Sequence, residues 1–103
     1  MVKLNLGGFA PFYPSVPSSN DPDTLKNGWY SLAGIEADDT YKSKLPYTAS
    51  ASTRGLMLAS GAYSGGKYCQ VIYRPSVGEI YMRYSNSGTT WGGWYKFVGT
   101  LVE

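Results

Sequence analysis

The strongest secondary-structure signal in the chain is GLMLASGAYSGGKYCQVIYRPSVGEIYMRYS, residues 55–85. It contains three strand-length runs rich in β-branched, aromatic and aliphatic side chains, and a fourth run follows; they cover residues 55–61, 67–74, 79–85 and 94–99. The connecting segments AYSGG, PSVG and NSGTTWGG supply glycine where a turn needs a positive φ. The sequence therefore predicts a mainly β fold, a small antiparallel β-sheet meander domain.

Alternation within residues 79–85 predicts which way the side chains of this strand point. Successive side chains of a strand lie on opposite faces of the sheet, so Ile80, Met82 and Tyr84 share one face. Tyr81 and Arg83 share the other. We expect the first set to face the core and the second to face outward, where tyrosine and arginine are typical of an interface.

Upstream of the meander, the sequence predicts one short helical turn and a further strand. Asp21 offers a capping oxygen and Pro22 suits the first helical position, but an Asn-Gly pair follows almost at once. We therefore expect a single helical turn near residues 22–26 and a strand over residues 28–33.

Two segments show no clear period. Residues 34–54 alternate poorly, and we expect a short irregular strand or a surface excursion there. Residues 1–19 contain three prolines, which suits a connecting or edge segment. The aromatic residues of this segment, Phe9, Phe12 and Tyr13, predict that it packs against a neighbouring surface.

The composition restricts the classes of function. A chain of 103 residues is a single domain by size. Its nine basic and seven acidic residues form no run, and no apolar stretch is long enough to span a bilayer, so we expect no nucleic-acid partner and no membrane insertion. The chain has no histidine and one cysteine, which removes the commonest general base and any multi-cysteine zinc site. We therefore expect no enzyme activity and no cofactor.

Pairs of aspartates are the remaining candidates for catalysis or metal binding. Asp21 and Asp23 already suit a helix N-terminus. Asp38, Asp39 and Thr40 offer hard oxygen ligands but lack the ladder of ligands that calcium loops display. Adjacent aspartates are more often a solvated turn, so we expect no catalytic residue and no metal site.

Five motifs follow one another over residues 20–98: DPDTLKNGWYSLAG, GLMLASG, YCQVIYR, GEIYMRYS and TTWGGWYKF. In order and spacing they resemble the knob domain of phage tail fibres and R-type pyocin fibres. That family runs from a D-x-x-T opening with G-x-Y, through a Q-x-x-Y strand and an x-x-Y-x-R strand, to a closing W-x-x-W.

The resemblance implies a structural and host-adhesion element of a phage or phage-like tail fibre, a knob domain in a homotrimer. It places the chain on a virion fibre outside the cell, with bacterial surface glycan or lipopolysaccharide as the expected receptor. Residues 1–19 would be a connector or fibre leader, 20–99 the knob-like β domain and 100–103 a C-terminal tail. The alternative is a carbohydrate-binding, lectin-like module, stand-alone or accessory to a glycan-degrading spike.

The closing W-x-x-W motif poses a question of its own. Regular alternation sends Trp91 and Trp94 to opposite faces, whereas a bend at Gly92-Gly93 brings both to one side. We expect Trp94 to close the core and Trp91 to be the more exposed of the two.

The candidate sites fall into two groups. The loop at residues 85–91 places hydrogen-bonding groups beside an indole, a combination suited to stacking on a sugar, although a solvated turn is the simpler interpretation. Its candidate ligand-binding residues are Asn86, Thr89, Thr90 and Trp91. The candidate interface residues are Tyr81, Arg83, Phe9, Phe12 and Tyr13.

Overall fold

The computed structural model describes residues 11–14, 21–25, 27–64 and 67–103, the side chains of residues 62–64 excepted. Within these residues the chain forms one six-stranded sheet whose strands lie in sequence order. The strands are β1 (Phe12–Tyr13), β2 (Gly28–Ser31), β3 (Leu56–Ser64), β4 (Lys67–Arg74), β5 (Glu79–Ser85) and β6 (Tyr95–Val98). The mainly β class and the antiparallel meander, here β2 to β6, are confirmed.

The predicted helical turn is also present, as the 3-10 turn η1 (Pro22–Thr24). The Asp21 carboxylate accepts a hydrogen bond from the Asp23 backbone N–H at 2.8 Å, which caps the turn. The Leu25 N–H donates to the Pro22 carbonyl at 3.2 Å, so the turn closes after three residues.

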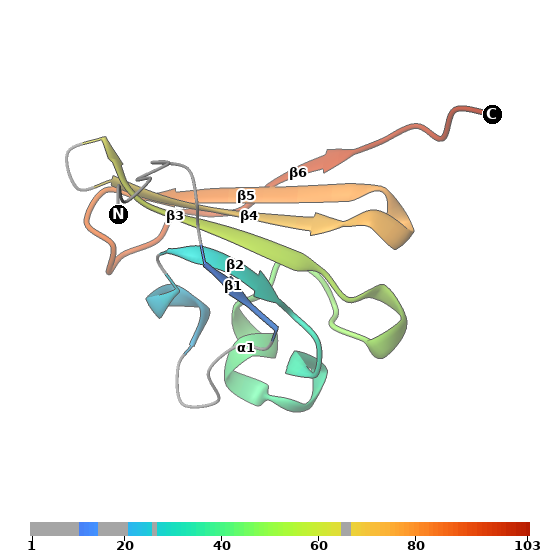
Figure 1. The fold of residues 1–103 in the computed structure, drawn as a ribbon, viewed down its shortest axis with the longest axis horizontal. Helices are drawn as coiled ribbons and strands as arrows, with labels where there is room; N and C mark the ends of the chain where they lie inside the picture. The colour runs from blue at the N-terminus through green and yellow to red at the C-terminus, as the bar shows by residue number, and fades with distance from the viewer. Residues whose placement is uncertain (1–10, 15–20, 26, 65–66) are drawn as a thin grey trace, which may run out of the picture.

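Residues 34–54 form helical turns against the sheet, so the expectation of an irregular strand or a surface excursion is wrong. Together with residues 21–25, 32 and 33 they make up what we call the cover. The segment contains η2 (Ile35–Ala37), α1 (Asp39–Lys44) and η3 (Ala51–Thr53). The Asp38 carboxylate caps α1 by accepting from the Tyr41 N–H at 3.1 Å. The Tyr41 side chain is buried, and Figure 1 shows α1 on one side of the sheet. A helix of six residues with one buried side chain is too short to show a period in the sequence.

The core lies between the sheet and this cover. Its buried side chains come from the cover (Leu25, Leu32, Ile35 and Tyr41) and from β2 to β5 (Tyr30, Met57, Ala59, Ile72 and Tyr81). Polar side chains on the same face of the sheet are buried with them: Gln70, Arg74, Arg83 and Ser85.

The face of β5 that meets the core is opposite to the one predicted. Tyr81 and Arg83 are each 4% exposed, whereas Ile80 and Met82 are 39% and 37% exposed. The Tyr81 hydroxyl donates to a carboxylate of its own strand at 2.9 Å, and Arg83 Nε donates to Gln70 at 2.9 Å. Because these polar ends have partners, the face can be buried. The prediction failed because both faces of β5 are rich in bulky side chains. The face that is buried is the one on which residues 21–54 pack, and the alternation of β5 does not reveal it.

Strand β1 lies at the edge of the sheet, as the prolines around it predicted, but the direction of its pairing was not predicted. It pairs with β2 in parallel, and the Tyr13 ring stacks on Tyr30 with centroids 4.8 Å apart. Gly28, at φ +124°, permits the close approach, because a Cβ there would lie 2.8 Å from the Pro11 carbonyl oxygen. Phe12 is largely exposed. Phe9 lies outside the described residues.

Candidate functional site

The side of the sheet that faces away from the cover is almost entirely apolar. We call this side of β2 to β6 the open face. Its members follow from the strand register and alternation: Trp29, Ser31, Leu56, Leu58, Ser60, Cys69, Val71, Tyr73, Ile80, Met82, Tyr84, Tyr95 and Phe97, with Lys67 at its rim. One row, Trp29, Leu58, Val71, Met82 and Tyr95, crosses all five strands without a polar residue.

The open face is most exposed on β5 and β6. Tyr84, Tyr95 and Phe97 are 45%, 57% and 52% exposed. On β2 and β4 the aromatic side chains of the open face pack against each other, because the Trp29 and Tyr73 rings stack with centroids 6.0 Å apart. A contiguous apolar patch of this kind is often functional even on a monomer, because it marks a binding or association surface. The open face is therefore the candidate functional site.

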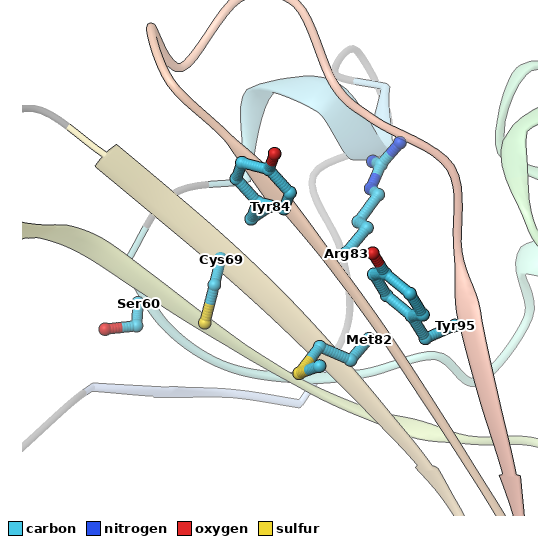
Figure 2. Close-up of a pocket in the computed structure, with 6 residues that line it drawn as sticks. All are labelled: Ser60, Cys69, Met82, Arg83, Tyr84 and Tyr95. Atoms are coloured by element: carbon cyan, nitrogen blue, oxygen red, sulfur yellow. The ribbon is translucent and has the colours of Figure 1, made fainter.

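A hollow of about 350 Å³ lies at one end of the open face. Figure 2 shows the Tyr84 and Tyr95 rings beside it with the sulfur atoms of Cys69 and Met82. Burial raises the pKa of the Cys69 thiol, which keeps it protonated and poorly reactive at neutral pH. The lining is thus suited to an apolar side chain rather than to a charged group. We call it the β4–β6 hollow.

Another hollow, of about 420 Å³, lies at the opposite end of β6, between Ile80 and Phe97. Its charged border consists of Arg74 and Glu79, whose side chains bond to each other at 2.5 Å. This hollow therefore offers apolar surface but no charge in need of a partner.

The two tryptophans of the W-x-x-W motif converge on Arg83. Both indole centroids lie 4.5 Å from the guanidinium carbon, so the bend at Gly92-Gly93 does bring them to one side. Trp91 Nε1 donates to a backbone carbonyl of η1 at 3.0 Å, and Trp94 Nε1 donates to one at the end of α1 at 3.3 Å. Trp94 packs against the core as predicted. Trp91 is half-buried as well and ties the loop to η1.

An ion-pair network continues from Arg83 into the cover. Arg83 Nη2 lies 3.0 Å from Asp23 Oδ1, and these two buried atoms form an ion pair without hydrogen-bond geometry. Lys44 Nζ bonds to Asp23 at 2.8 Å and to Asp21 at 3.2 Å. Burial lowers the pKa of Arg83, against the opposite effect of Asp23. The network fastens the cover to the sheet.

The loop at residues 85–91 uses its own hydroxyl groups to hold its shape. Ser85 Oγ donates to the Thr90 carbonyl at 2.6 Å and accepts from the Gly88 N–H at 2.8 Å. Ser87 Oγ and Thr89 Oγ1 share a hydrogen bond of 2.9 Å. Asn86, Thr89 and Thr90 are exposed, as a ligand site requires, but these bonds are those of a well-formed turn. The candidate glycan site therefore remains a prediction.

Two of the predicted interface residues are buried in the chain's own core region instead of facing outward. Tyr81 and Arg83 are buried beneath the cover of their own chain and leave no surface for a second molecule. Phe12 and Tyr13 are exposed on the edge strand β1, at 62% and 38%. Sequence reasoning missed the open face, although alternate positions of β3, β4 and β5 form an almost entirely apolar set, which alternation alone could have shown.

The aspartates weighed for catalysis or metal binding have structural partners. Asp21 and Asp38 cap η1 and α1, and Asp39 pairs with Lys42 at 3.4 Å. Within the described residues there is no cluster of three or more carboxylate or cysteine side chains placed to hold a metal ion. No helix in that part of the chain has the length and apolarity to cross a membrane.

Comparisons with protein-family models, curated proteins and solved structures found no match to this chain.

Proposed function

We propose that this chain is a structural and host-adhesion element of a phage or phage-like tail fibre, a knob domain that works as a homotrimer on the outside of the particle. The observation that carries the proposal is the open face. It is apolar across five strands and carries one charge, Lys67, at its rim. The motif order in the sequence supplies the fibre context.

The energetics of the open face favour association over a solitary existence. Apolar surface left in water contributes nothing to folding and promotes association, and each square ångström covered by a partner contributes about 25 cal/mol. A charged substitution there should block association without unfolding the chain, because side chains such as Met82 touch water already.

Sedimentation velocity over a concentration series tests this proposal. The unsubstituted chain should form a trimer, Met82→Asp should shift it toward monomer, and Thr40→Asp, a charge placed on exposed α1, should leave it unchanged. Adhesion of the trimer to host cells or lipopolysaccharide is the second measurement. A chain that stays monomeric throughout would contradict the proposal.

The aromatic side chains support a second candidate, a carbohydrate-binding module. Tyr84, Tyr95 and Phe97 present exposed rings on one face, and rings stack on the apolar faces of sugars. A glycan array separates the two candidates. A monomer that binds sugar and loses binding on Tyr95→Ala favours the module, and a trimer without sugar binding favours a fibre node.

A further inference from the structure

The segment after β6 projects from the sheet with apolar side chains in water. We call residues 99–103 the arm. The Gly99 N–H donates to the Gly78 carbonyl at 2.8 Å, and beyond it Leu101 and Val102 are 84% and 90% exposed. Figure 1 shows the arm leading away from the body of the molecule. Like the open face, it carries apolar surface that its own chain leaves uncovered.

The symmetry of a trimer decides which pairs of surfaces can meet between its copies. Two identical open faces stacked on each other make a two-fold contact, which closes as a dimer. A three-fold ring needs a contact between two different surfaces, repeated head to tail. The arm and the β4–β6 hollow are two different surfaces with matching apolar character.

We infer that the arm of each copy binds the β4–β6 hollow of the next copy, an inference that rests on the trimer proposed above. Leu101 enters the hollow between the rings of Tyr84 and Tyr95. The hollow, about 350 Å³, is larger than one leucine side chain. The arm of the same copy starts at the far end of β6 from this hollow and leads away from it, so a neighbouring copy supplies the occupant.

Spacing along the two strands agrees with this contact. Leu101 and Glu103 are two residues apart, so in an extended arm they point the same way and lie about 7 Å apart. Cys69, in the hollow, and Lys67, at the rim, have the same separation on the same face of β4. With Leu101 in the hollow, Glu103 therefore lies beside Lys67 of the neighbouring copy, while Val102 points away.

The charges favour the same register. Among the described lysines, Lys42, Lys44 and Lys96 have carboxylate partners within 3.4 Å, and Lys67 has none. Glu103 likewise has no basic partner among the described residues. The other hollow offers no such match, because its charges already pair with each other.

The size of the surfaces explains why the arm is required. Five strands spaced about 4.8 Å apart and three rows of side chains about 6.8 Å apart give the open face roughly 480 Å². A standard protein interface buries about 800 Å² on each partner. The arm adds the missing apolar area and, unlike the flat face, fixes the direction of the contact.

The test compares substitutions within the arm of the full 103-residue chain by sedimentation equilibrium. Leu101→Asp should weaken trimer association about ten- to hundredfold, as expected for losing one buried leucine. Val102→Asp is the matched control, one residue away and facing outward, and should change association less than about fivefold, by the size of a surface charge effect, about 0 to 1 kcal/mol. Equal effects of the two substitutions would overturn the inference.

A charge exchange tests the register independently. Glu103→Lys and Lys67→Glu should each weaken the trimer about two- to fivefold at low salt, and the double variant should regain the parental association. A trimer unaffected by Leu101→Asp and Glu103→Lys would overturn the arm contact and leave the fibre proposal intact. A dimer that Met82→Asp disrupts and Leu101→Asp does not would overturn both.

Discussion

Replacement of Arg83 by alanine should be among the most destabilising changes in the chain. Arg83 is 4% exposed, bonds to Gln70, pairs with Asp23 and contacts both indoles of the W-x-x-W motif. It is the point where β5, the cover and the closing loop meet. Truncation at Cβ removes all of these contacts together and leaves a cavity.

The expected loss follows from the separate contacts. An unpaired Gln70 carbonyl inside the protein costs about 1 to 3 kcal/mol. Each indole contact contributes about 1 kcal/mol. Asp23 keeps its bond to Lys44 at 2.8 Å, so its carboxylate is not left alone. The sum, about 3 to 5 kcal/mol, agrees with the usual cost of breaking a buried ion pair. A domain of this size has about 5 to 15 kcal/mol in all.

Urea unfolding followed by tryptophan fluorescence measures this loss, at one fixed chain concentration so that association does not enter the comparison. Arg83→Met is the informative control. It keeps the bulk of the side chain and removes the desolvated charge, so it should cost less than Arg83→Ala. If Arg83→Ala unfolds within about 0.5 kcal/mol of the parent, Arg83 is not the centre of this network.

Three further predictions concern other parts of the network and the sheet. Trp94→Ala should lower the free energy of unfolding by about 2 to 4 kcal/mol and Trp91→Ala by less, since Trp94 packs on the core; urea unfolding ranks them, and the reverse order would contradict the assignment. Burial raises the pKa of Tyr47 to about 12, so the folded state holds a proton that the unfolded state loses above about pH 10, and stability should fall from there toward pH 12. Tyr47→Phe should reduce this alkaline loss, and an unchanged pH profile would refute it. Gly28→Ala should cost about 1 to 3 kcal/mol and speed exchange of the Trp29 amide, which bonds to Pro11 at 2.7 Å; unchanged exchange would contradict it.

The sequence was sufficient for the elements whose signal is local. Alternating runs and glycine turns located β4 and β5 to the residue, and Asp21 with Pro22 located η1. The parallel pairing of β1 was not predictable, because it depends on the contact of Gly28 with Pro11, residues far apart in sequence.

The orientation of β5 shows a different limit. Alternation separates Tyr81 from Met82 but assigns neither to the core when both sides of a strand are bulky. What buries Tyr81 and Arg83 is the cover, and its α1 carries too few residues to show a helical period. The open face was missed for the same reason, because its β5 residues Ile80, Met82 and Tyr84 were predicted to face the core.

This sheet buries polar and charged side chains beside its hydrophobic core and leaves an almost entirely apolar face toward water. Its covered face holds Gln70, Arg74 and Arg83, while the face toward water is aliphatic and aromatic. Roughly 480 Å² of open face on each copy is well below the about 800 Å² that a standard interface buries on each partner, and these side chains are already partly buried. Association also costs about 4 to 15 kcal/mol in lost freedom, so flat stacking alone is a weak contact. In the assembly proposed above, the contact of Leu101 and Glu103 with a neighbouring copy adds the missing area, so the arm, rather than the flat face, should control assembly.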